Sequence, residues 1–220
     1  MIGPAGLAAC IFDVDGVLLA SPHERAWREA LDGLADPARF TTPIYLAEVA
    51  GKPRAAGALA ALRALAVADP EAKACAYAIR KQVRLESLMR QGAVTPFPDA
   101  LGFVQAVFDA GLKLAVASSS RNANQMMQGV RLPSGRSLLD AFGANTCGRD
   151  LTRGKPDPEI FLLAAAELGV AAEVCLVVED SVAGIEAGRR GGMTTLGVAR
   201  LGDAAALCAA GADLVVTRLD

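Results

Sequence analysis

The fold of this 220-residue chain is decided by the stretch Ala8-Ala9-Cys10-Ile11-Phe12-Asp13-Val14-Asp15-Gly16. Five apolar residues in a row are typical of a buried strand, and the acidic residues after them mark its end. Similar apolar runs that end at polar residues occur at residues 112–117, 174–178, 194–199 and 214–216. Helical patterns separate these runs, and this alternation predicts a parallel α/β sheet.

Residues 18–95 interrupt the alternation. They contain no β-branched run, and their patterns are helical at residues 22–34, 55–66 and 71–91. The chain returns at Thr95-Pro96-Phe97-Pro98, where the prolines break any helix. We therefore expect an α/β fold: a Rossmann-like, doubly wound parallel sheet core of residues 1–17 and 96–220, with an inserted all-helical cap domain of residues 18–95.

Composition and charge exclude several classes of protein. With 53% hydrophobic residues, the chain can bury a substantial core. Its 22 basic and 24 acidic residues give a formal net charge of −2, which supplies no field that would attract nucleic acid. No window approaches the roughly 18 consecutive apolar residues that a membrane span requires. We expect neither nucleic-acid nor membrane partners, and we favour a monomer.

The cysteines and the N-terminal segment bear on the cellular compartment. The five cysteines are an odd number, and most lie inside apolar runs, which is typical of buried thiols in a reducing compartment. Residues 1–12 lack the basic residues that begin a signal peptide and run directly into Asp13 and Asp15. We therefore expect a cytoplasmic protein.

Chemically reactive side chains gather at the ends of the predicted strands. They are Asp13, Asp15, Ser118, Glu179 and Asp180, with Lys155 in the loop before a helix. In open parallel sheets, ligands bind beyond the carboxyl ends of the strands. Several carboxylates at one edge repel one another unless a cation lies among them, and oxygen ligands of this kind suit Mg²⁺ bound together with phosphate. The pattern favours Mg²⁺-dependent phosphoryl transfer.

Each of these residues taken alone also has an explanation without chemistry. Asp-x-Asp is common in turns, and a serine after a strand is often a helix cap. Glu179 and Asp180 would favour the N-terminus of the helix that we expect to begin at Ser181, and Lys155 could be a surface lysine. Their shared position at strand ends is what favours a site.

Four segments together resemble the motifs of the haloacid dehalogenase superfamily. They are Asp13-Val14-Asp15-Gly16-Val17-Leu18, Ser118, Gly154-Lys155-Pro156-Asp157-Pro158-Glu159-Ile160-Phe161, and Val178-Glu179-Asp180-Ser181-Val182-Ala183-Gly184-Ile185. Within that superfamily, the sequence is most similar to the branch of β-phosphoglucomutases and sugar phosphatases. The helical insertion resembles the small cap of that branch.

The resemblance implies four catalytic residues. Asp13 would be the nucleophile that forms an aspartyl-phosphate, and Asp15 would be the general acid and base. Ser118 and Lys155 would hold the transferring oxygens.

The resemblance also implies a Mg²⁺ site. The Asp13 carboxylate, the Asp15 backbone carbonyl and the Asp180 carboxylate would hold the ion, and Glu179 would ligate it directly or through water.

Six further residues match substrate-contacting positions of the branch: His23, Trp27, Arg54 and Lys81 in the cap, and Ser119 and Asn122 in the core. The cap residues also fit purely structural roles, since a lone Trp is usually a core residue and helical charges are usually solvated.

The sequence departs from the mutase pattern at several places. The linker 19–22 is short, Ala50 and Gly57 stand where the mutase has Lys and Ser, and residues 128–150 are longer than usual. We therefore expect a phosphatase of a small phosphorylated metabolite such as a sugar phosphate. The alternatives are a β-phosphoglucomutase and, from another class, a non-catalytic binding protein. A dehalogenase fits less well, because Asp15 suits phosphoryl transfer.

Overall fold

The computed structural model describes residues 6–220, which form two compact units. Of these residues, 6–20 and Pro96–Asp220 form one unit, and Ser21–Thr95 form the other. We call them the core unit and the cap unit. We expected the chain to leave the core unit after residue 17. It leaves after Ala20, because Leu19–Ala20 still forms a strand (β2) of the core unit.

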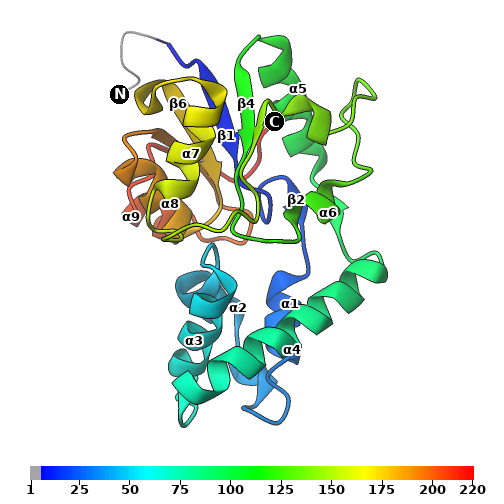
Figure 1. Cartoon of the computed structure of the whole chain (residues 1–220), viewed down its shortest axis with the longest axis vertical. Coiled ribbons are helices and arrows are strands. Elements are labelled where there is room, and N and C mark those ends of the chain that lie inside the picture. The colour runs from blue at the N-terminus through cyan, green and yellow to red at the C-terminus, as the bar shows by residue number, and fades with distance from the viewer. Residues whose placement is uncertain (1–5) are drawn as a thin grey trace. The chain divides into compact units, whose positions relative to one another are not determined.

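The described part of the core unit contains a six-stranded sheet (Figure 1). Its order is β5 (Ala144–Asn145), β4 (Lys113–Val116), β1 (Ala9–Phe12), β6 (Cys175–Glu179), β7 (Thr194–Val198) and β8 (Leu214–Val216), and all neighbours are parallel. The expected α/β class is confirmed. Strand β5 was not expected, because it is only two residues long.

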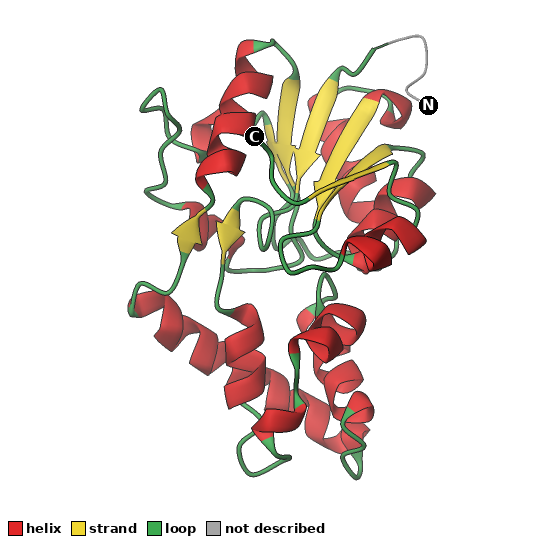
Figure 2. Ribbon diagram, turned by 180° about the vertical axis from the view of Figure 1, so that it is seen from behind, coloured by secondary structure: helices red, strands yellow, loops and turns green. Residues whose placement is uncertain are grey.

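Helices lie on both sides of this sheet (Figure 2). They are α5 (Pro98–Asp109), α6 (Ala123–Met127), α7 (Glu159–Leu168), α8 (Val182–Arg190) and α9 (Ala204–Ala209), with short 3₁₀ turns at Leu139–Ala141 and Ala172–Val174. Successive side chains of a strand point to opposite faces. Accordingly, Ile11 packs in a cluster with Phe161 of α7, whereas the ring of Phe12 meets that of Phe103 on α5 at 6.0 Å.

The register of the central strands places their ends side by side. Phe12 is paired both with Val116 and with Val178. The backbone N–H of Asp13 donates to the carbonyl of Val178 (3.0 Å), and that of Ala117 donates to Phe12 (2.8 Å). Residues at the ends of β1, β4 and β6 therefore meet at one edge of the sheet.

The cap unit is built from helices. They are α1 (His23–Glu29), α2 (Thr42–Ile44), a π-helical turn at Tyr45–Val49, α3 (Arg54–Ala64) and α4 (Pro70–Arg90), with a 3₁₀ turn at Pro37–Arg39. Trp27, Leu62 and Tyr77 belong to its buried cluster. Helix α1 is shorter than the expected helix 22–34, and the chain runs on through turns to residue 36.

The two chain crossings pair with each other. Strand β2 and strand β3 (Thr95–Pro96) form a two-stranded sheet, and the backbone N–H of Phe97 donates to the carbonyl of Leu18 (3.0 Å).

Residues 131–137 of the long segment 128–150 form a tight hairpin against α5. The N–H of Leu132 donates to the carbonyl of Arg136 (2.9 Å), and Gly135 takes a positive φ of 85° in the turn. The Arg136 guanidinium lies 4.6 Å from the centre of the Phe108 ring. The hairpin adds no strand to the main sheet, and the strand of that sheet that lies in segment 128–150 is the short β5.

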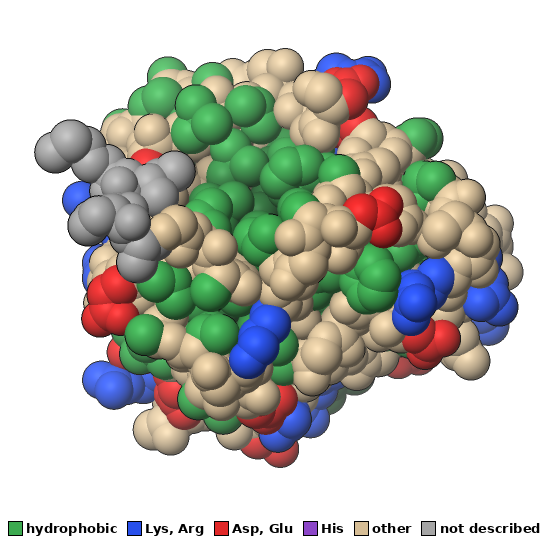
Figure 3. Space-filling view, turned by 90° about the horizontal axis from the view of Figure 1, so that it is seen from above, with side chains coloured by type: hydrophobic (Ala, Val, Ile, Leu, Met, Phe, Trp, Pro, Cys, Tyr) green, Lys and Arg blue, Asp and Glu red, His purple; other side chains and the backbone are tan. Residues whose placement is uncertain are grey.

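Figure 3 shows the end of the core unit where the strands begin. Hydrophobic side chains gather at its centre, and charges of both signs are mixed at its margins. No helix in residues 6–220 has the length and apolar character needed to cross a membrane. Within the same residues the five cysteines form no disulfide; Cys10, Cys147 and Cys175 are buried, and Cys75 and Cys208 are exposed.

Candidate active site

The predicted reactive side chains of the core unit meet at the end of its central strands. Asp13 follows β1, Ser118 follows β4, and Glu179 ends β6. All three are buried, as is Lys155 from the loop before α7. Buried polar side chains must find partners, so their contacts define the site.

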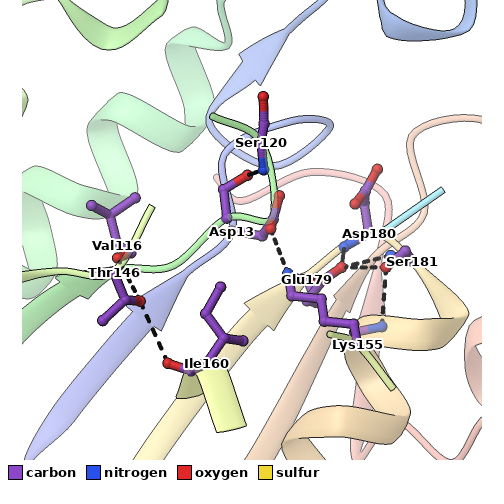
Figure 4. A network of polar contacts seen from close by, with 11 residues as sticks. Asp13, Val116, Ser120, Thr146, Lys155, Ile160, Glu179, Asp180 and Ser181 are labelled. Atoms are coloured by element: carbon purple, nitrogen blue, oxygen red, sulfur yellow. Dashed lines mark hydrogen bonds and ion pairs between the residues drawn. The ribbon is translucent and has the colours of Figure 1, made fainter. Parts of the chain in front are cut away.

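Lys155 lies between two carboxylates (Figure 4). Its Nζ atom donates to Oδ1 of Asp13 and to Oε1 of Glu179, each at 2.5 Å. The Lys155 side chain is 0% exposed, and Nζ also lies 4.8 Å from the centre of the Phe161 ring. Burial by itself would lower the pKa of Lys155, but the two carboxylates outweigh it and raise that pKa. Both carboxylates therefore favour the charged form of the lysine.

Glu179 is held by the start of α8. Its Oε2 atom accepts hydrogen bonds from the N–H of Asp180 (2.8 Å), the N–H of Ser181 (2.8 Å) and the hydroxyl of Ser181 (2.9 Å). Ser181 also caps the helix, as expected, by accepting from the N–H of Gly184 (3.1 Å). A Cβ on Gly184 would lie 1.9 Å from the Glu179 carboxylate, so only glycine fits there. With Lys155, Glu179 accepts four hydrogen bonds, about as many as a carboxylate holds.

Asp180 lies against the loop that follows β1. Gly16 has a φ of 82°, and a Cβ at this residue would lie 1.8 Å from Oδ2 of Asp180. Glycine at this position lets the carboxylate approach the backbone next to Asp15. Burial, followed by the charges of Glu179 and Asp13, raises the pKa of Asp180 well above its usual value.

The site carries more negative than positive charge. Burial raises the pKa of Asp13 to about 7, with Glu179 and Asp15 adding to the shift and Lys155 opposing it. The single ammonium of Lys155 is shared between Asp13 and Glu179, and the carboxyl groups of Asp15 and Asp180 lie close enough to act on the same charges. Such an imbalance is relieved by a bound cation.

The donors present fit Mg²⁺. No group of three or more His, Cys, Asp or Glu side chains in residues 6–220 is arranged to hold a metal. Mg²⁺ needs fewer, because it is usually held by one or two carboxylates and keeps several waters or phosphate oxygens. Asp13 and Asp180 supply two carboxylates, and the close approach of Asp180 to Gly16 places it beside the Asp15–Gly16 peptide.

Ser118 is fixed in a turn after β4. Its Oγ atom accepts from the N–H of Ser120 (3.1 Å), and the Ser120 hydroxyl oxygen accepts from the N–H of Asn122 (3.2 Å). The carbonyl of Ser118 accepts from the N–H of Gly148 (2.9 Å). Asn122 is buried, and Ser119 lies in the same turn. These bonds hold a cluster of hydroxyl and amide groups beside the carboxylates.

Three of the predicted cap residues meet inside the cap unit. Lys81 is buried, with Nζ 2.8 Å from Nδ1 of His23 and 4.8 Å from the centre of the Trp27 ring. The Tyr77 hydroxyl donates to the carbonyl of Trp27 (2.8 Å). Arg54 is the first residue of α3. His23, Trp27 and Lys81 thus form a cluster, of which Trp27 is a packed member.

Sequence reasoning missed two residues of the core site. Phe161 provides the ring beside Lys155 and could have been noticed within the motif 154–161, where it reads as an ordinary core residue. Arg200 follows β7 and bonds to the loop after Asp15. Its signal was a charged residue at a strand end, and no role was given to it.

Comparisons with known proteins identify the family of the chain. The family model of the haloacid dehalogenase-like hydrolases matches residues 7–192. The chain is 35% identical to a β-phosphoglucomutase of Mycobacterium tuberculosis, over 98% of this chain and 91% of that protein. It is 32% identical to the phosphorylated carbohydrates phosphatase of Thermotoga maritima, over 96% of this chain and 94% of that protein.

A solved structure supports the same assignment. The archaeal β-phosphoglucomutase from Pyrococcus sp. superposes with a TM-score of 0.73 at 28% identity, over 96% of this chain and 92% of that one. The site and these likenesses lead to one conclusion. The chain is an enzyme of the haloacid dehalogenase-like hydrolase family.

Proposed function

We propose that this enzyme is a Mg²⁺-dependent phosphatase that acts on a small phosphorylated metabolite, with sugar phosphates as the expected substrate class. The observation that carries the proposal is the buried Lys155 that joins Asp13 to Glu179. Lys155 holds one oxygen of the Asp13 carboxylate in place. The carboxylate stays at the end of β1, where an incoming phosphate would meet it. Relatives named as a phosphorylated carbohydrates phosphatase and a hexitol phosphatase support the substrate class.

The first half of the reaction transfers the phosphoryl group to the enzyme. An oxygen of Asp13 attacks phosphorus, a new O–P bond forms, and the bond between phosphorus and the ester oxygen breaks. Asp15 gives its proton to the departing oxygen, so the product leaves as an alcohol. Lys155 and Ser118 stabilise the phosphoryl oxygens, together with Ser119 and Asn122 in the same turn.

The second half returns the enzyme to its starting state. Asp15, now ionised, removes a proton from water as the water oxygen attacks phosphorus. The bond between phosphorus and Asp13 breaks, and inorganic phosphate is released. Mg²⁺ held by the Asp13 and Asp180 carboxylates and the Asp15 carbonyl would neutralise charge on the phosphoryl oxygens.

In this proposal Glu179 is not a direct ligand of the metal. Its four hydrogen bonds to Lys155, Asp180 and Ser181 occupy its oxygens. We place it as the residue that orients Lys155 and the start of α8. Contact with the metal through a water, the other possibility in our prediction, is compatible with this position.

The cap unit would supply the substrate contacts outside the phosphoryl group. His23 and Lys81 are the proposed polar contacts to a monophosphate, and the Trp27 ring supports Lys81. Arg54 would contact a second phosphate, where the substrate carries one. Ala50 and Gly57 favour a phosphatase over a mutase. Ala50 is buried, and a Cβ on Gly57 would already lie 3.2 Å from Val49, so neither position offers the polar group of the mutase pattern.

A second candidate function is β-phosphoglucomutase. The mycobacterial relative that is 35% identical along nearly the whole chain favours it. The two functions share Asp13, Asp15, Ser118 and Lys155, and they differ in whether water or a sugar hydroxyl takes the phosphoryl group.

One experiment tests both functions. Purified enzyme is given Mg²⁺ and a panel of phosphorylated metabolites, and phosphate release is measured beside conversion of β-glucose 1-phosphate to glucose 6-phosphate. Phosphate release from a sugar phosphate that is absent in Asp13→Asn supports the phosphatase. Isomerisation faster than phosphate release would replace it with the mutase, and neither activity would overturn both.

We also propose that the enzyme works in the cytoplasm as a monomer. The five cysteines, none of them in a disulfide within residues 6–220, support a reducing compartment. Light scattering in solution tests the monomer, and fractionation of the source cells tests the location.

A further inference from the structure

Arg200 makes a buried set of contacts at the end of β7, all within the core unit. Its Nε atom donates to the carbonyl of Gly16 (3.1 Å), and its Nη2 atom donates to the carbonyl of Val17 (3.3 Å). The guanidinium carbon lies 3.8 Å from the centre of the Phe97 ring. The side chain is only 12% exposed. One arginine therefore touches the chain both where it leaves the core unit and where it returns.

Asp99 holds Arg200 from the other side. Its Oδ2 atom accepts from Nη1 of Arg200 (2.9 Å) and from the backbone N–H of Leu219 (2.9 Å). Asp99 lies in the first turn of α5, and its side chain is 4% exposed. The planar guanidinium fork is thus fixed at three of its nitrogens, which a lysine ammonium would not reproduce.

These contacts fix the backbone that carries Asp15. The N–H of Gly16 donates to the carbonyl of Leu19 (2.9 Å), and Arg200 holds the carbonyl of the same glycine. Both peptide groups that flank Gly16 are therefore restrained. Since peptide groups are planar, restraining them also restrains the direction of the preceding residue, Asp15. Gly16 has a left-handed φ and no side chain, so the loop has little rigidity of its own.

We propose that Arg200 is a positioning residue for Asp15. By holding the carbonyls of Gly16 and Val17, it keeps the Asp15 carboxyl where its proton reaches the ester oxygen as the bond between that oxygen and phosphorus breaks. Arg200 itself touches neither substrate nor reacting atoms. The inference rests on the proposed function, because it assigns Arg200 to the acid–base step of that reaction.

The role has a kinetic signature that a merely structural arginine lacks. A weakly acidic leaving group needs the proton of Asp15, whereas a strongly acidic one departs with little help. Phenyl phosphate and p-nitrophenyl phosphate have nearly the same shape but differ in this property. A displaced Asp15 should therefore slow hydrolysis of phenyl phosphate much more than hydrolysis of p-nitrophenyl phosphate. A displacement of about 1 Å can cost roughly 100-fold in rate.

The test measures kcat/KM for both substrates in Arg200→Lys and Asp99→Asn. For Arg200→Lys we expect a fall of about 10–100-fold on phenyl phosphate and less than about 3-fold on p-nitrophenyl phosphate, with KM little changed. Asp99→Asn should also lower kcat/KM more for phenyl phosphate than for p-nitrophenyl phosphate, but by a smaller factor. It also serves if Arg200→Lys does not fold. The control is Arg189→Lys, an exposed arginine whose Nη1 atom also donates to a backbone carbonyl, that of Ala210 (3.2 Å), away from the Asp15 loop.

The outcomes separate the inference from the proposed function. A parent enzyme that releases phosphate neither from these two substrates nor from any member of the metabolite panel removes the function and the inference together. If the parent is active and Asp15→Asn loses phenyl phosphate selectively, the function stands. The positioning role is wrong if Arg200→Lys and Asp99→Asn then lower kcat/KM equally for both substrates. It is also wrong if their effects are the same as that of Arg189→Lys.

Discussion

The Nζ atom of Lys155 lies 2.5 Å from Oδ1 of Asp13, with the lysine side chain fully buried. The two residues are 142 positions apart in the chain, and Glu179 completes the contact from a third segment. A lysine in this place both neutralises the nucleophile and fixes its orientation. The pair therefore links the stability of the core unit to its chemistry.

Replacing Lys155 should cost both stability and activity. Lys155→Met leaves Asp13 and Glu179 buried without their cation, and breaking a buried ion pair typically lowers the free energy of unfolding by about 3–5 kcal/mol. Urea unfolding measures this loss. The double variant Lys155→Met with Glu179→Gln should recover part of the stability but no turnover. A single variant as stable as the parent would show that Lys155 does not hold these acids together.

Removal of the metal should abolish turnover, because the surplus carboxylates of the site need a divalent cation. EDTA should stop phosphate release, and Mg²⁺ should restore it. Mg²⁺ should also raise the melting temperature of the parent, since a ligand that binds only the folded state stabilises it. In Asp180→Asn this stabilisation should require a higher Mg²⁺ concentration. Full activity in a metal-stripped sample would contradict the proposed site.

The two aspartates after β1 should fail in different ways. Asp13→Asn should prevent formation of any phosphoryl or fluoroberyllate adduct, because the attacking oxygen is lost. Asp15→Asn should keep its backbone carbonyl and bind Mg²⁺, yet lose about 10²–10⁴-fold in turnover through the missing proton transfer. Mass spectrometry of the trapped adduct and steady-state rates give the two readouts. An Asp15→Asn enzyme close to parental activity would refute the acid–base role.

The reactive residues of the core unit were predictable because local sequence places them. A buried strand must end, and polar residues after three parallel strands meet at one sheet edge whatever the loops do. Asp13, Ser118 and Glu179 were found in this way, and Lys155 came from its motif. The direction of each contact was not predictable. The sequence presents Glu179 as a candidate ligand, and only the fold shows its oxygens turned to Lys155 and Ser181.

Other features could not be predicted, because they depend on contacts between distant residues or on segments too short to give a sequence pattern. Arg200 meets Gly16 and Asp99 across 184 and 101 positions, and nothing near Arg200 in the chain indicates either partner. Strand β5 is too short to show alternation. The hairpin at 131–137 is held by Arg136 against Phe108 and lies in a stretch that gave no interpretable pattern.

The pH dependence of stability should report on Asp99. Burial acts to raise the pKa of this carboxyl, but the Leu219 amide and the Arg200 guanidinium outweigh it and hold the pKa below its usual value. A group whose pKa is lowered by folding stabilises the protein above its unfolded pKa, about 3.9, and loses that contribution as the pH falls through the folded pKa.

The comparison is between the parent and Asp99→Asn. The variant should be less stable by about 1 kcal/mol at pH 7, and the difference should shrink below roughly pH 4. Urea unfolding at a series of pH values measures both curves. A difference that stayed constant down to pH 2 would mean that the Asp99 charge does not contribute.

Arg54 should distinguish hydrolysis from mutation, because the two reactions differ in how the cap treats the rest of the substrate. In a mutase, the intermediate carries a second phosphate, and a charge-assisted contact to it is typically worth about 1.5–3 kcal/mol. Arg54→Ala should then depress isomerisation of sugar phosphates by about 10–100-fold and leave hydrolysis of p-nitrophenyl phosphate nearly unchanged. In a phosphatase for a monophosphate, both activities should change little.

We expect the second result, because Ala50 and Gly57 bring no polar groups to the same part of the cap unit. Lys52→Ala, two residues earlier in the loop before α3, is the matched control for loss of a positive charge. The measurements are β-glucose 1-phosphate conversion and phosphate release for the parent and both variants. A parent that isomerises faster than it hydrolyses, with that preference lost in Arg54→Ala and kept in Lys52→Ala, would establish the mutase, because only a second phosphate bound at Arg54 explains the loss.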